Sequence, residues 1–287
     1  MDFRDYIGLH IRLKESILQA AIEAHELGLK TFQFFLSLNQ KDSHNSYVTI
    51  TAEDKKKFIE LSKNHFSDIY IHTSYWINPA SGKKASYDAA GSLLKKEIRI
   101  AQELELNKLV LHPGSATGYL PTPTDTTCKE EGIDAVARML NSIIKAESDI
   151  IIILENTAHG NRAIGSDLTD FPRIKAKLNH PEKVRFCIDF AHAFGYGYDL
   201  EDADAFIGLV DSTLGLANLE LIHFNDSQEK FGGKKDKHAY PGYGMIGKKV
   251  LKSYLHHDSL KKVNKILELP QSSSENLRTV IDELCAW

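Results

Sequence analysis

Hydrophobic and polar residues divide this chain into two alternating kinds of segment. Short apolar runs recur along the whole sequence, and each is followed by a polar turn and an amphipathic stretch of helical period. Because the runs are continuously apolar, they are typical of parallel strands covered on both faces. The predicted strands are Tyr6–His10, Thr31–Phe35, Asp68–His72, Lys108–His112, Asp149–Glu155, Val184–Asp189, Leu219–His223 and Val263–Glu268.

The amphipathic stretches between these runs predict helices. In the first of them, Ile17, Ala20, Ala21 and Ala24 fall on one face, and Gly28 is a suitable helix stop. The predicted helices are Leu13–Leu27, Thr51–Asn64, Tyr87–Leu104, Cys128–Ala146, Asp167–Leu178, Asp202–Thr213, Lys248–His257 and Ser273–Leu284.

Eight strand–helix units in a chain of 287 residues predict an α/β fold, a single (β/α)8 TIM barrel. We expect one catalytic domain over residues 1–287, with the active site at the C-terminal mouth of the strands. An open doubly wound sheet is the alternative, and it requires that the first and last strands do not pair.

The composition excludes several classes of protein. A net charge of −4 argues against a broad basic surface for nucleic acid, but it is compatible with a local basic rim or bound cations. No apolar run approaches the roughly 20 residues that span a bilayer, and the N-terminus lacks a signal-peptide apolar region. Cys128, Cys187 and Cys285 are too widely spaced for a disulfide framework. We therefore expect a cytoplasmic protein with no membrane partner.

Histidines and carboxylic acids stand at the ends of almost all the predicted strands. The stretch from Leu219 to Gly247 is the clearest case, because its apolar run ends in His223 and its Gly-rich loop carries Asp226, Asp236 and His238. The ends of barrel strands converge on one mouth, where active sites are built. The candidate site residues there are His10, His72, His112, Glu155, Asp189, His192, His223, Asp236, His238 and Glu268.

Such a concentration of ionisable groups indicates bound metal. Burying these groups together is very costly without cations. Without His10, the list has five histidines and four carboxylates and no cysteine; such a set suits zinc, manganese or iron and is too large for one ion. Among the candidate ligands, His192 is expected on a Gly-rich loop, three residues after Asp189. Clustered divalent ions favour hydrolysis of a phosphate ester.

Six motifs occur in order along nearly the whole chain. They are Ile71-His72-Thr73-Ser74-Tyr75 with Asn78, His112-Pro113-Gly114, Leu154-Glu155-Asn156-Thr157, Asp189-Phe190-Ala191-His192-Ala193, His223-Phe224-Asn225-Asp226-Ser227, and Gly232 through Asp236-Lys237-His238 to Gly242-Tyr243-Gly244-Met245-Ile246-Gly247. Together they resemble the signatures of the endonuclease IV family, the zinc-dependent apurinic/apyrimidinic (AP) endonucleases. The motifs are specific jointly, whereas His-Pro-Gly alone would be weak.

The resemblance implies a site for about three zinc ions, with manganese or iron as substitutes. It also implies that Glu155 and Glu268 are catalytic, with Glu155 beside the hydroxide that attacks phosphorus. By the same resemblance, the ligands are His72, His112 and Glu155 for one ion, Glu155, Asp189, His223 and Glu268 for the second, and His192, Asp236 and His238 for the third.

The implied reaction is cleavage of double-stranded DNA 5′ to an abasic site in base excision repair. It leaves a 3′-hydroxyl and a 5′-deoxyribose phosphate, and the abasic nucleotide has to be flipped out of the duplex. Tyr75 matches the family tyrosine that fills the gap in the base stack. Lys41, Lys237 and His10 are further expected DNA contacts, and the protein is expected to act as a monomer.

Three departures from the family pattern concern the surface that reads DNA. His10 is followed by Ile11-Arg12-Leu13-Lys14 instead of a small residue and a Gly-Gly turn. The loop of the second strand, Ser37–His44, lacks the arginine and tryptophan usual there. Lys237 stands where arginine is usual, and lysine cannot form a bidentate phosphate contact. These departures bear on substrate preference more than on reaction type.

Two other function classes explain part of the pattern. A sugar isomerase or epimerase of the same barrel superfamily binds one metal ion, which Glu155, Asp189, His223 and Glu268 would hold, and it does not need the other ligands. A non-catalytic damage-binding protein would have lost ligands, and none is lost.

Overall fold

The barrel is built from eight parallel strands. A computed structural model describes residues 3–37, 47–119, 125–160, 162–270 and 273–287 of the chain. The barrel strands are β1 (Ile7–His10), β2 (Thr31–Phe35), β3 (Asp68–His72), β4 (Lys108–Leu111), β5 (Ile151–Glu155), β6 (Val184–Asp189), β7 (Leu219–His223) and β10 (Asn264–Leu267).

The sheet closes in the order β1-β10-β7-β6-β5-β4-β3-β2. Leu9 of β1 lies opposite Leu267 of β10 on one side and opposite Phe32 of β2 on the other. This pairing of the first and last barrel strands confirms the predicted (β/α)8 barrel and excludes the open sheet. His112 and Glu268, predicted as the last residues of their strands, lie one residue beyond β4 and β10.

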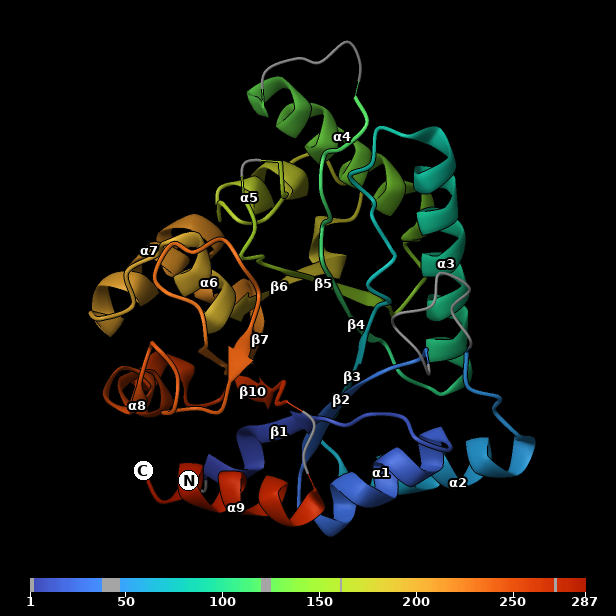
Figure 1. Ribbon diagram of the computed structural model, residues 1–287. Coiled ribbons are helices and arrows are strands. Elements are labelled where there is room, and N and C mark those ends of the chain that lie inside the picture. The colour runs from blue at the N-terminus through green and yellow to red at the C-terminus, as the bar shows by residue number, and fades with distance from the viewer. Residues whose placement is uncertain (1–2, 38–46, 120–124, 161, 271–272) are drawn as a thin grey trace.

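Helices surround the barrel (Figure 1). Thr51 caps its helix as predicted, because its hydroxyl accepts a hydrogen bond from the Asp54 amide at 3.0 Å. The first helix begins later than predicted, since Ser16 is its N-cap and accepts from the Gln19 amide at 3.1 Å. The helices are α1 (Ile17–Glu26), α2 (Ala52–His65), α3 (Lys84–Glu103), α4 (Asp125–Ile143), α5 (Asp170–Lys175), α6 (Phe190–Tyr196), α7 (Ala203–Leu214), α8 (Lys248–His256) and α9 (Ser274–Cys285).

The expectation of a loop directly after Asp189 is wrong, because α6 begins there and carries His192. The Asp189 carboxylate accepts a hydrogen bond from the His192 amide at 2.7 Å, which caps the helix. Gly197 ends it with a φ of 113°, a left-handed conformation that favours glycine. A second unpredicted element is the short antiparallel pair of β8 (Asp226–Ser227) and β9 (His238–Ala239) after β7.

Apolar side chains fill the barrel interior below the mouth. They include Tyr70, Val110, Ile153, Cys187, Leu221 and Ile266.

The two chain ends lie side by side (Figure 1), where Arg4 pairs with Asp282 of α9. Among the described helices, none is both long and apolar enough to cross a membrane.

Candidate metal centre

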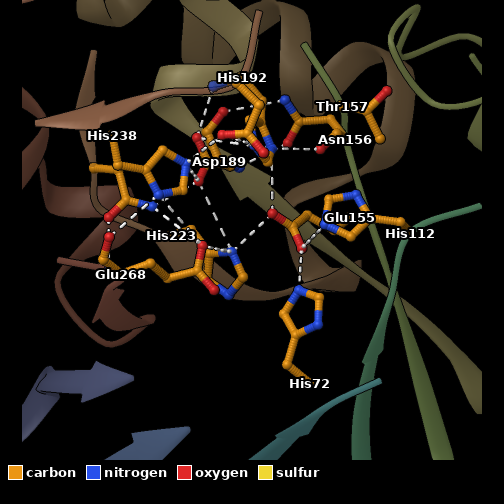
Figure 2. A network of polar contacts seen from close by, with 12 residues as sticks. His72, His112, Glu155, Asn156, Thr157, Asp189, His192, His223, His238 and Glu268 are labelled. Atoms are coloured by element: carbon orange, nitrogen blue, oxygen red, sulfur yellow. Dashed lines mark hydrogen bonds and ion pairs between the residues drawn. The ribbon is translucent and has the colours of Figure 1, made fainter. Parts of the chain in front are cut away.

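The predicted ligands meet at the carboxyl ends of the barrel strands. A cavity of about 780 Å³ opens there, and its wall includes His72, His112, His192, His238 and Glu268. Figure 2 shows these imidazoles and carboxylates pointing toward one another from different strands and loops. Three groups of ligand atoms lie close enough together to hold an ion, namely His72 with His112 and Glu155, Glu155 with Asp189, His223 and Glu268, and Asp189 with His192 and His238.

The first group is organised around the fully buried Glu155 at the end of β5. Glu155 Oε2 lies 3.1 Å from His72 Nε2 and 3.3 Å from His112 Nε2. The His72 Nδ1–H group donates to the carbonyl of Thr73 at 2.9 Å, so Nε2 keeps its lone pair. Burial lowers the pKa of His112 to about 4, which favours the neutral imidazole that a metal requires.

The second group uses the other oxygen of the same carboxylate. Glu155 Oε1 lies 2.8 Å from Nδ1 of His223, and Glu268 Oε2 lies 3.4 Å from that nitrogen. Asp189 Oδ2 is 3.9 Å from it. Because its two oxygens face two different groups, Glu155 is placed to bridge two ions.

The third group combines α6 with the loop after β7. His192 Nε2 and His238 Nε2 lie 3.2 Å and 3.1 Å from Oδ1 of Asp236, and Asp189 Oδ2 lies 3.5 Å from His238 Nε2. The resemblance assigned Asp236 to this ion and Asp189 to the second one. In the structure Asp236 adjoins both histidines, and Asp189 lies within reach of both groups.

The residues fit bound metal better than they fit a hydrogen-bonded cluster. Although they approach Asp236, the buried Nε2 atoms of His192 and His238 form no hydrogen bond with any described residue. Their Nδ1 atoms donate to the carbonyls of Asn156 and Glu268, at 2.9 Å and 3.2 Å, so both Nε2 lone pairs face the cluster. This arrangement is common in histidines that bind metal.

Electrostatics also favours cations in this cluster. Burial by itself raises the pKa of Glu155, but the surrounding histidines, His112 and His223 above all, outweigh burial, and the pKa falls well below its usual range. Burial likewise lowers the pKa of His192, whereas Asp189 and Asp236 more than reverse this and raise it well above its usual value. The buried carboxylates therefore need positive charge among them, which protons on the imidazoles or metal ions can supply.

Three amide side chains support the candidate ligands and were not identified from the sequence. Asn225 Nδ2 donates to Asp189 Oδ2 at 2.7 Å, and the Asp189 amide donates to the Asn156 side chain at 2.6 Å. Gln33 of β2 contacts Glu268 and His223. The available signals were a glutamine in the middle of the run Thr31–Phe35 and asparagines close after Glu155 and His223.

Asp226, which belongs to the same stretch as the candidate ligands His223 and His238, has a structural role instead. Its carboxylate accepts hydrogen bonds from the backbone amides of Gly242, Gly244, Ile246 and Gly247, at 2.9–3.1 Å. A Cβ at Gly244 would lie 2.4 Å from Asp226 Oδ1, so only glycine fits this close approach. Asp226 thus shapes the loop that follows the candidate metal ligands.

The four expected DNA contacts lie in different surroundings. The Tyr75 side chain is 71% exposed and lines the cavity, with Trp76 beside it in a T-shaped ring contact. Lys237 also lines the cavity, and its Nζ lies 3.3 Å from Glu229. The ring of His10 is mostly buried, and its Nδ1 accepts a hydrogen bond from Gln33 at 2.9 Å. Lys41 lies outside the described residues.

Comparisons with known proteins agree with this geometry. A family model described as a xylose isomerase-like TIM barrel matches residues 22–287. A probable endonuclease 4 from Thermosipho melanesiensis is 31% identical over 274 residues, which cover 92% of each chain. The solved endonuclease IV of Thermus thermophilus is 25% identical with a TM-score of 0.78, covering 97% of this chain and 99% of the other. A D-tagatose 3-epimerase-like protein shares the fold at 16% identity, with a TM-score of 0.65 and 98% of both chains covered.

Proposed function

Because this chain belongs to the endonuclease IV family of xylose isomerase-like TIM barrels, we propose that it is a metal-dependent phosphodiesterase that cleaves DNA 5′ to abasic sites. The products are a 3′-hydroxyl and a 5′-deoxyribose phosphate. The reaction is a step of base excision repair. The observation that carries the proposal is the convergence of three adjoining ligand groups on one cavity. Three ions fit a phosphate ester, whose charge has to be neutralised during hydrolysis.

The proposed cofactor is zinc, about three ions per chain, held by the nine residues of the cluster. When bound, the ions supply an activated water molecule and neutralise charge on the phosphate. Glu155 joins the first two groups through its two oxygens, and it is placed to orient the attacking water. Glu268 of the second group, 3.4 Å from the ligand nitrogen of His223, is the other proposed catalytic carboxylate.

Substrate recognition rests on the rim of the cavity. The cluster is recessed, with His72, Glu155 and His223 all buried, so a nucleotide has to leave the base stack to reach it. The exposed Tyr75 at the cavity edge is placed to fill the vacated position. An abasic nucleotide suits such a site because it has no base to unpair. Action as a monomer stays a prediction.

Metal analysis combined with a cleavage assay tests this proposal. Protein purified without chelators should contain about three divalent ions per chain, mostly zinc. It should also nick a duplex carrying one abasic analogue on the 5′ side of the lesion. Treatment with a strong chelator should abolish the nicking, and added zinc should restore it. Three ions per chain without any nicking would contradict the proposed activity.

A sugar isomerase or epimerase is the second candidate, and the fold shared with a D-tagatose 3-epimerase-like protein favours it. The second ligand group is sufficient for the single ion of such an enzyme. The other five predicted ligands then have no role, although all of them line the same cavity, and they are His72, His112, His192, Asp236 and His238. One ion per chain and turnover of a ketose, with no cleavage of DNA, would favour this candidate.

A further inference from the structure

Gln33 lies between aromatic residues in the middle of a barrel strand. It belongs to β2, whose sequence is TFQFF, and its side chain is fully buried. The amide nitrogen lies 2.8 Å from Glu268 Oε1 and 2.9 Å from His10 Nδ1. The amide oxygen lies 3.0 Å from His223 Nε2. Each polar atom of this side chain therefore contacts the ligand cluster or its edge.

The chemistry of the partners decides which way the amide points. An ionised carboxylate only accepts hydrogen bonds, so the NH2 group of Gln33 has to face Glu268. With the nitrogen on that side, the oxygen faces Nε2 of His223 and accepts its hydrogen. The reversed amide would place two oxygens against each other at the Glu268 contact.

This orientation determines the tautomer of His223. With its hydrogen on Nε2, the neutral imidazole carries a lone pair on Nδ1. That nitrogen faces the carboxylates of Glu155 and Glu268, at 2.8 Å and 3.4 Å, where a proton or a metal ion has to lie between them (Figure 2). The opposite tautomer serves in His72 and His192, whose Nδ1–H groups donate to backbone carbonyls and which face the cluster through Nε2.

We propose that Gln33 is a positioning residue for metal binding: it holds His223 in the tautomer that coordinates through Nδ1 and orients Glu268 in the same group. The inference rests on the proposed metal centre and concerns its second ligand group. Backbone carbonyls orient His72 and His192, but a side chain orients His223, so substitution can remove this support. The second hydrogen of the amide meets His10 Nδ1, which leaves the hydrogen of His10 on Nε2.

The test compares Gln33→Met with wild type and with Thr31→Val. Methionine keeps approximately the size of glutamine and removes both ends of the amide. Thr31 lies on the same strand, is equally buried, and its hydroxyl has no hydrogen-bond partner among the described residues, so Thr31→Val controls for a change in the strand itself. Competition with a chromogenic chelator measures the affinity for zinc.

We expect Gln33→Met to lower the affinity for one zinc ion by about 10- to 100-fold, which is the usual effect of losing a group that orients a ligand. The affinity for the other zinc ions should not change. Thr31→Val should bind zinc as wild type does. Equal affinities in all three proteins would overturn the inference while leaving the metal centre intact. Wild-type protein that takes up no divalent ion would overturn the metal centre and the inference together.

A second measurement needs no variant and therefore does not depend on the folding of Gln33→Met. Ring-nitrogen spectra of ¹⁵N-labelled, zinc-loaded protein report which nitrogen of each histidine carries hydrogen. His223 should carry it on Nε2, whereas His72 and His192 should carry it on Nδ1. Hydrogen on Nδ1 of His223 would refute the proposed role of Gln33.

Discussion

The hydroxyl of Tyr47 donates a hydrogen bond to the buried carboxylate of Glu97 at 3.0 Å, and this contact joins the segment before α2 to α3. The same carboxylate accepts from the backbone amide of Ser74 at 3.2 Å. Ser74 directly precedes Tyr75, the proposed DNA-reading residue. Glu97 thus holds the loop that carries Tyr75. Burial raises the pKa of Glu97 to about 7 despite these hydrogen bonds.

Glu97→Gln should change how stability depends on pH. Between pH 4.5, the usual pKa, and pH 7, the folded protein holds a proton that the unfolded chain has released, so Glu97 makes stability fall as pH rises. A shift of this size corresponds to about 3 kcal/mol in the free energy of unfolding. Glutamine does not titrate, so the variant should gain stability relative to wild type across this interval.

Denaturant unfolding of both proteins between pH 4.5 and 8 measures this difference. Other titrating groups are common to the two proteins and cancel when one curve is subtracted from the other. Parallel curves would show that Glu97 titrates normally.

Glu155→Gln should keep the fold and remove most of the DNA cleavage. The change preserves shape and removes the charge that faces two ligand groups, so we expect turnover to fall by at least about 100-fold. Single-turnover cleavage and metal content should be measured on the same sample. Glu97→Gln, the same change at another buried carboxylate, should retain its full metal content. Near-normal turnover at full metal content in Glu155→Gln would remove Glu155 from the mechanism.

Tyr75→Ala should weaken cleavage of duplex DNA more than cleavage of a single strand. A stacking side chain is useful only where neighbouring bases leave a gap, and such contacts contribute about 1–3 kcal/mol per base. Tyr243→Ala is the matched control, because Tyr243 is also highly exposed but lies outside the cavity wall. If Tyr75→Ala impairs both substrates equally, the ring serves ordinary packing at the rim.

Restoring arginine and tryptophan at Lys41 and Ser43 should tighten binding to abasic duplex. Lys41 supplies one positive charge but lacks the planar guanidinium, and Asp42 adds a negative charge next to it in the sequence. We expect the restored loop to lower the half-saturating DNA concentration with little change in the maximal single-turnover rate.

A DNA titration at one fixed salt concentration tests the restored loop, since salt alone shifts such affinities strongly. Lys56→Arg on α2, an exposed site, controls for the exchange of lysine for arginine. Unchanged affinity in the restored protein would assign the reading of DNA to another element.

Local patterns were sufficient to predict the barrel. Continuous apolar runs identified all eight barrel strands to within two residues, because a parallel strand that is covered on both faces favours an apolar residue at every position. The cap at Thr51 was predictable for the same reason, since it depends only on neighbouring residues. The helix α6 was not predictable, because seven residues are too few to display a helical period.

The sequence alone determined which residues reach the mouth of the barrel, since strand ends converge there whatever their order. Only the tertiary structure decided how these residues divide into groups. Glu155 faces His72 with one oxygen and His223 with the other, and Gln33 reaches His223 across 190 positions of the chain. Such distances depend on barrel closure and strand register, which arise from pairing between distant segments and leave no local pattern.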